Sequence, residues 1–148
     1  MEIVPYHSSM REQIIQIWEQ SVRATHHFVT EDDIVFFSSI VKNIDFENIP
    51  IFCAIEGTDL LGFIGIVEQK IEMLFVAPLS MGRGIGTALL LYAFTYCDAW
   101  FVDVNEQNIN AVEFYIKHGF SISDRSDTDG TGKPYPLLHM KRSLSEYL

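Results

Sequence analysis

The sequence has little positive charge and little cysteine. Its 20 acidic residues outnumber its 10 lysines and arginines, which gives a formal net charge of −10. That balance opposes nucleic-acid binding through a basic face and mildly favours a cationic or neutral amine as partner. The two cysteines, Cys53 and Cys97, lie far apart and form no CxxC or other metal-ligand spacing. We therefore expect free thiols in a reducing cytoplasm, and no metal site.

Long hydrophobic runs are absent as well. No apolar stretch reaches the roughly 18 residues that a membrane-spanning helix needs, so no membrane partner is expected. The first residues, MEIVPYHSSMRE, lack the basic and then apolar segments of a signal peptide. We find no internal repeat, linker or low-complexity tract, and 48% of the 148 residues are hydrophobic, enough for a packed core. These features predict one globular cytoplasmic domain, residues 1–148.

Hydrophobic periodicity and capping residues predict an α/β fold, a mixed sheet with helices on both faces. Ser9 and Glu12 have the form of a capping box, and Thr30 is a second candidate N-cap. A polar, glycine-rich stretch, residues 124–133, is predicted to be a mobile flap. The expected elements are a strand at 2–6, helices beginning at Ser9 and Thr30, strands at 51–56, 60–67 and 70–76, a helix at 84–96, a strand at 99–104, a helix at 109–118, and strands at 120–123 and 137–141.

The most informative segment is LFVAPLSMGRGIGTALL, residues 74–90. An apolar strand runs into a turn with three alternating glycines, and the turn opens into a helix. Glycine lets the backbone approach a ligand closely, and the first N–H groups of a helix have no internal partner. Together with the helix dipole, these features predict a binding site for a pyrophosphate.

Two common phosphate-binding loops do not match this turn. A P-loop requires GxxxxGK followed by serine or threonine, and no lysine follows these glycines. A dinucleotide-binding fold requires GxGxxG with an acidic residue about 20 residues further on, whereas the spacing here is GxGxG.

With its surroundings, the turn resembles the GNAT superfamily of acyl-coenzyme A N-acyltransferases. The matching residues are Val76-Ala77-Pro78, Met81-Gly82-Arg83-Gly84-Ile85-Gly86, and Asn108-Ile109-Asn110-Ala111 through Phe114-Tyr115 to Gly119-Phe120. Met81 departs from the pattern, which usually has glutamine or arginine there. Segments 21–28, 104–108 and 132–139 are similar to the YjaB-like branch of bacterial acetyltransferases.

The resemblance implies a mostly antiparallel sheet of about six to seven strands with about four helices, and acetyl-CoA as the acyl donor. Backbone groups of Leu74 and Val76 would pair with the pantetheine arm, and Arg83 would lie beside the phosphates. The full set of cofactor-binding residues implied is Leu74, Phe75, Val76, Met81, Gly82, Arg83, Gly84, Ile85, Gly86, Thr87, Asn108 and Tyr115.

The same resemblance implies the catalytic residues. Tyr115 would protonate the departing thiolate. Glu72 is the candidate general base, because a carboxyl group in an apolar strand would have a raised pKa. Asn105, at the end of a strand, would hold the acceptor or a water. Three histidines, His26, His27 and His139, compete with Glu72 for the role of base, and water could also relay the proton.

The acceptor site is expected at the end of the first helix and near the last strand. Its candidate residues are His26, Phe28, Asn105, Tyr135 and His139. We expect a small-molecule amine such as an amino acid, short peptide or amine-bearing antibiotic. A protein lysine or N-terminus is the alternative acceptor, and a CoA-binding module without turnover is the alternative of another class. The chain is expected to be a monomer or homodimer.

Overall fold

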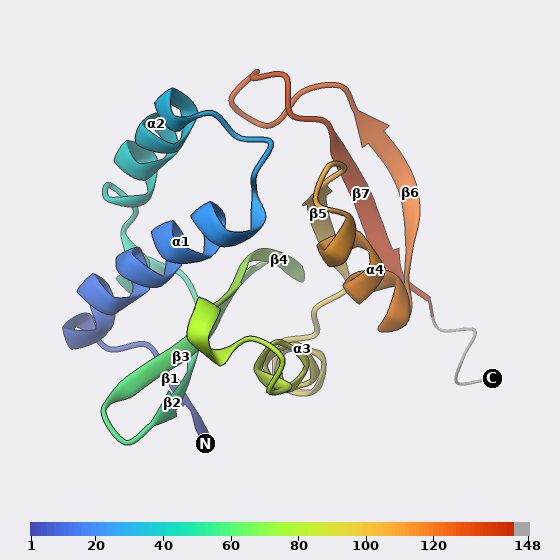
Figure 1. Cartoon of the computed structure of the whole chain (residues 1–148). Coiled ribbons are helices and arrows are strands. Elements are labelled where there is room, and N and C mark those ends of the chain that lie inside the picture. The colour runs from blue at the N-terminus through green and yellow to red at the C-terminus, as the bar shows by residue number, and fades with distance from the viewer. Residues whose placement is uncertain (144–148) are drawn as a thin grey trace. The chain divides into compact units, whose positions relative to one another are not determined.

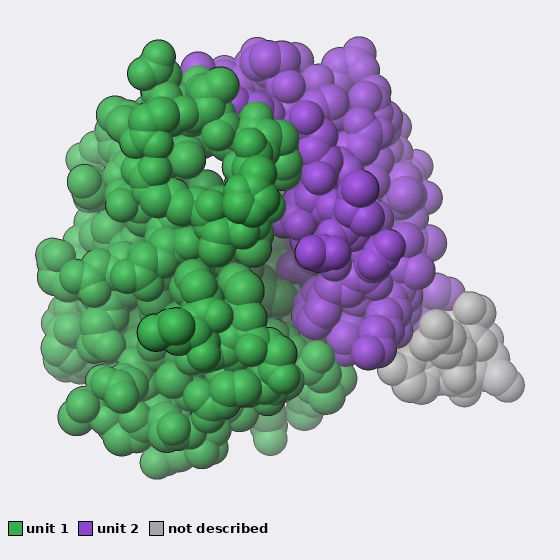
Figure 2. Space-filling model, viewed as in Figure 1, with its two compact units in different colours: residues 1–99 green, residues 100–148 purple. Residues whose placement is uncertain are grey.

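The computed structural model describes residues 1–143 of the chain, which divides into two compact units, residues 1–99 and 100–148 (Figure 2). The described residues contain seven strands and four α-helices, and the strand pairs within each unit are antiparallel. The predicted fold class is confirmed. No described helix combines the length and hydrophobicity that crossing a bilayer requires.

The first unit is a four-stranded meander with helices on both faces (Figure 1). Along the two outer helices, apolar residues at helical spacing, among them Ile14, Trp18 and Ile34, join one buried core with Cys53 and Phe63 of the sheet. The elements are β1 (Glu2–Pro5), α1 (Arg11–Thr25), α2 (Glu31–Val41), β2 (Ile51–Glu56), β3 (Asp59–Val67), β4 (Lys70–Val76) and α3 (Ile85–Tyr96).

Strand β3 is buried on both faces over seven consecutive residues, Leu60 to Ile66. Phe63 faces the core under α1 and α2, whereas Gly62 faces α3. A Cβ atom on Gly62 would lie 2.8 Å from the carbonyl oxygen of Phe75 and 3.3 Å from the Cγ2 atom of Ile85. The glycine therefore lets β4 and the first residue of α3 pack closely on β3.

The second unit pairs three strands in the order β5–β7–β6, and helix α4 packs against β5 and β6 (Figure 1). Val102, Val104, Leu138 and Met140 alternate along β5 and β7 and are buried. The elements are β5 (Phe101–Asn105), α4 (Ile109–Lys117), β6 (Phe120–Ser126) and β7 (Leu137–Arg142).

Two local predictions were wrong. Ser9 does not cap α1, because residues 8–10 form a 3-10 turn and the imidazole of His7 accepts the Ser9 N–H at 3.1 Å. Strand β6 runs to Ser126, so it takes in the first residues of the predicted flap at 124–133. In the rest of that segment the Asp129 carboxylate accepts the N–H groups of Thr131 and Lys133, which forms a hydrogen-bonded turn.

Substitution of Gly62 by alanine is expected to destabilise the protein by about 1–3 kcal/mol, because the new methyl group would overlap the backbone of β4. Urea denaturation measures this loss. Gly130→Ala is the matched control, since a Cβ atom there meets nothing within 4 Å. Equal midpoints for the two variants would show that the sheet accommodates the methyl group by shifting.

Candidate acetyltransferase site

Strand β4 directs the backbone groups of alternate residues to opposite edges. The Ala77 N–H donates to the Leu61 carbonyl of the neighbouring β3 strand at 2.8 Å, and Phe75 pairs with Phe63 in the same register. Hydrogen-bonded pairs alternate along an antiparallel ladder. The backbone N–H and C=O groups of Leu74 and Val76 therefore point away from β3, which is the orientation that an added pantetheine strand requires.

The glycine turn has the backbone geometry that only glycine adopts without strain. Gly82 and Gly84 both have φ of +78°, and a Cβ atom on either would meet nothing within 4 Å. Gly84 is the N-cap of α3, so the first N–H groups of that helix follow directly. Met81, before the turn, is extended and 41% exposed. An anion can therefore approach the backbone N–H groups at Gly82 and Gly84 without meeting a Cβ atom.

Arg83 lies in the turn and forms an ion pair with Glu56, at the end of β2, with 3.0 Å between Nη2 and Oε2. Both side chains are about half exposed, 49% and 56%. Exposed ion pairs of this kind contribute about 0–1 kcal/mol. Glu56 therefore holds the guanidinium weakly enough for a phosphate to displace it.

Glu72 does not have the buried setting that its predicted role assumed. Gly65 faces Met73 across the ladder, whereas Ile66 faces Ile71, so Glu72 is the extra residue of a β-bulge. Its side chain is exposed. Glu72 therefore lacks the burial on which its predicted role as general base rested.

In the second unit, Asn108 and Tyr115 occupy the two ends of α4. The Asn108 side-chain oxygen accepts the Ala111 N–H at 3.2 Å, which makes Asn108 the N-cap. Tyr115 is 6% exposed and packs edge-to-face on Phe114 and Phe120. Burial raises the pKa of the Tyr115 phenol well above its usual value, so the phenol keeps its proton across the working pH range.

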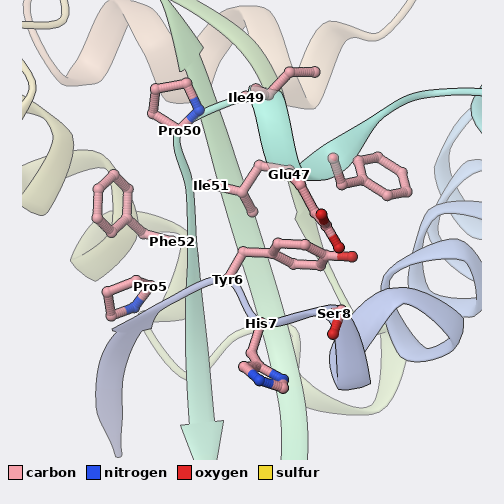
Figure 3. A pocket seen from close by; sticks show the side chains of 10 residues that line it. Pro5, Tyr6, His7, Ser8, Glu47, Ile49, Pro50, Ile51 and Phe52 are labelled. Atoms are coloured by element: carbon pink, nitrogen blue, oxygen red, sulfur yellow. The ribbon is translucent and has the colours of Figure 1, made fainter.

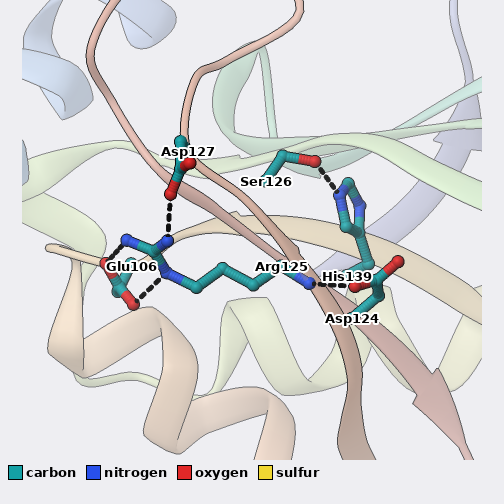
Figure 4. Close-up of polar contacts among 6 residues, drawn as sticks. All are labelled: Glu106, Asp124, Arg125, Ser126, Asp127 and His139. Atoms are coloured by element: carbon teal, nitrogen blue, oxygen red, sulfur yellow. Dashed lines mark hydrogen bonds and ion pairs between the residues drawn. The ribbon is translucent and has the colours of Figure 1, made fainter.

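His139 is held between two polar side chains on neighbouring strands. Its Nδ1 atom lies 2.6 Å from an Asp103 carboxylate oxygen. Its Nε2 atom lies 2.6 Å from the Ser126 hydroxyl (Figure 4). Asn105 pairs with Leu137 and is the last residue of β5, whereas the predicted strand ended at Val104. Asp103 and Ser126 were missed from the sequence, since no local motif links residues so far apart.

The end of α1 carries His26, the C-cap residue, whose ring lies 5.3 Å from that of Phe28. The Thr25 hydroxyl lies 2.7 Å from the Nδ1 atom of His26. Burial, with a smaller contribution from His27, lowers the pKa of His26 from 6.5 to about 4, so its imidazole is neutral at pH 7. Tyr135, in the second unit, is 6% exposed, so it is a buried side chain and not an open aromatic platform.

A surface pocket of about 390 Å³ lies in the first unit, between the segment after β1 and the segment before β2 (Figure 3). Tyr6 lies across it, with Glu47 beside it (Figure 3). None of the site residues predicted from the sequence lines this pocket.

The chain resembles known acetyltransferases over nearly its whole length. A family model described as "Acetyltransferase (GNAT) domain" matches residues 13–144. Peptidyl-lysine N-acetyltransferase YjaB of Salmonella typhimurium is 37% identical over 130 residues, which cover 87% of this chain and 89% of that protein. The solution structure of apo YjaB from Escherichia coli superposes with a TM-score of 0.87 at 33% identity, covering 95% of each chain. PaiA N-acetyltransferase from Thermoplasma acidophilum, solved with coenzyme A, shares the fold, with a TM-score of 0.71 at 23% identity over 97% of this chain and all of that one.

The depressed pKa of His26 predicts a loss of stability in mild acid. The unfolded chain takes up a proton on this imidazole near pH 6.5, whereas the folded protein does so only near pH 4. Stability should therefore fall between these values, by about 2–3 kcal/mol from this group alone. Urea denaturation at about pH 7.5 and about pH 4.5 measures the loss. His26→Gln should reduce it and His7→Gln should not; an equal loss in both variants would contradict the assignment.

Proposed function

The chain belongs to the GNAT family of acetyltransferases, and from that premise we propose that it transfers the acetyl group of acetyl-CoA to the side-chain amine of a lysine in a peptide or protein. Membership makes the protein an N-acetyltransferase whose acyl donor is acetyl-CoA. The lysine acceptor is supported by the names of the YjaB relatives at 35–37% identity. The net charge of −10 also favours a cationic acceptor. A small-molecule amine, the acceptor favoured by the sequence, stays a prediction.

We propose that the donor, acetyl-CoA, binds along the edge of β4 and at the glycine turn. The backbone groups of Leu74 and Val76 would pair with the pantetheine arm, and an N–H near Leu74 would donate to the thioester oxygen. The N–H groups of residues 82–87 would receive the pyrophosphate. Arg83 would exchange Glu56 for a phosphate oxygen, which replaces an exposed ion pair by a charge-assisted contact with a doubly charged group.

Tyr115 is the proposed donor to the departing sulfur. Its raised pKa means that full proton transfer to a thiolate, whose thiol pKa is about 8.5, is uphill. A buried phenol is nevertheless a fixed hydrogen-bond donor, and it stabilises negative charge most where water is excluded. We therefore assign Tyr115 to stabilising the developing thiolate by a hydrogen bond. Asn108 would contact the donor from the N-cap of the same helix.

The acceptor class can be tested by thiol release from acetyl-CoA. We expect faster release with a lysine-containing peptide blocked at its N-terminus than with free amino acids, dipeptides, polyamines or aminoglycosides. A preference for one of the small amines would replace lysine as the acceptor and leave acetyl transfer standing. Coenzyme A binding by calorimetry without release from any amine would favour a binding module.

Tyr115→Phe should lower kcat by about 10²-fold or more and leave the dissociation constant of coenzyme A unchanged, because only the group that meets the leaving sulfur is lost. Steady-state kinetics and calorimetry measure the two quantities. Tyr96→Phe is the matched control, since Tyr96 is 72% exposed. An unchanged kcat in Tyr115→Phe would remove the phenol from the mechanism.

A further inference from the structure

Three polar side chains in the second unit form a continuous hydrogen-bonded row across three neighbouring strands. Asp103 of β5 and His139 of β7 are direct cross-strand partners, and Ser126 lies on β6 at the other side of β7. The two contacts, Asp103 Oδ1 to His139 Nδ1 and His139 Nε2 to Ser126 Oγ, are both 2.6 Å long. The row combines a carboxylate, an imidazole and a hydroxyl in the order that proton transfer requires.

The two groups that flank His139, the Asp103 carboxylate and the Ser126 hydroxyl, determine which nitrogen of its imidazole carries the proton. An ionised carboxylate only accepts hydrogen bonds, so Asp103 places the proton of neutral His139 on Nδ1. The Nε2 atom then carries a lone pair, and the Ser126 hydroxyl donates to it. A proton that arrives at Ser126 can therefore pass to Nε2, and the imidazolium that forms is stabilised by Asp103.

The row lies on the face of β5–β7–β6 that α4 leaves open within this unit. Val102 and Val104 are buried on the α4 side, and strand alternation places Asp103 on the opposite side. The side chains of His139 and Asp103 are 32% and 25% exposed. The row is thus sheltered but within reach of solvent.

Three charged side chains lie near His139 on its own and the adjacent strands. Asp103 of β5 and Asp124 of β6 are its cross-strand partners, and Lys141 lies two residues further along β7. The Asp124 carboxylate accepts the N–H of Arg125. The Arg125 side chain extends away from His139 to Glu106 and Asp127 (Figure 4).

Resting on the proposed function, we propose that Ser126 and His139 remove the proton from the acceptor amine. The ammonium group gives a proton to the Ser126 Oγ atom as the hydroxyl proton moves to His139 Nε2. The neutral amine then forms a C–N bond to the thioester carbonyl, and the C–S bond breaks. The thiolate takes a second proton as the product nitrogen loses one, and His139 releases the first proton to water. Asp103 is a positioning residue, since it acts through His139.

The test is the pH profile of kcat/KM for acetylation of an N-terminally blocked lysine peptide, from about pH 6 to about pH 9.5. His139→Gln should lower the rate near neutral pH by about 10²-fold or more. Its rate should then rise with the fraction of free amine, so the gap to the unmodified protein narrows at high pH. Ser126→Ala should show the same behaviour, and Ser126→Thr, which keeps a hydroxyl, should restore the rate.

Two further measurements separate this relay from a structural role. Nitrogen NMR should show the Nδ1–H tautomer of His139, and Asp103→Asn should shift that tautomer while reducing the rate. Coenzyme A binding should be unchanged in all variants. His7→Gln, a histidine of the first unit that also bonds a serine, should keep both the rate and the pH profile.

The outcomes distinguish the two proposals. Thiol release by the unmodified protein with an unchanged rate and profile in His139→Gln would overturn the relay alone. A stable acetyl group on Ser126 after incubation with acetyl-CoA would also overturn it, because the serine would then be a nucleophile. No thiol release by the unmodified protein from any amine would remove the acetyl transfer on which the relay rests.

Discussion

The close packing at Gly62 is the constraint on which the first unit depends. The strand β3 is buried on both faces, and only a residue without a side chain lets Ile85 and the Phe75 carbonyl approach it together. Ile85 begins α3, and Phe75 lies in β4. One contact thus fixes the start of the helix, with its glycine turn, against the strand whose backbone the donor is proposed to use. A larger residue would separate these elements even though it lies in no binding site itself.

Local signals predicted most of the fold because they act within a few residues. Thr30 caps α2 through the Asp33 N–H, as its place before an acidic turn indicated. Gly119, directly after the C-cap of α4, has the positive φ value expected of a glycine at that position. Most predicted strand and helix bounds lie within two residues of the observed ones. The family likeness added the identity of the donor, acetyl-CoA, and the contacts that it implies between the donor and the glycine turn stay predictions.

The failures arise where a residue's partner is distant in sequence. Ser126 was placed in a flap because its own neighbours are polar, whereas pairing with β7 extends the strand to it. The bulge at Glu72 depends on the register with β3, which no local pattern encodes. Asp103 lies within the predicted strand 99–104 but was not singled out, since its partner His139 is 36 positions away. That the two units form one domain also stays a prediction.

The burial of Tyr115 and the partial exposure of His139 suit the two roles proposed for them. The proton on the acceptor must leave to water in each turnover, which requires a group in contact with solvent. The negative charge that develops on the sulfur is stabilised best by a fixed hydrogen-bond donor at a position from which water is excluded. Tyr115 is a buried residue of α4. The strands on which α4 packs carry Asp103, His139 and Ser126 on their other face. The alternation of side chains along one small sheet therefore separates the proposed hydrogen-bond donor, which is buried, from the proposed proton acceptor, which is in reach of water.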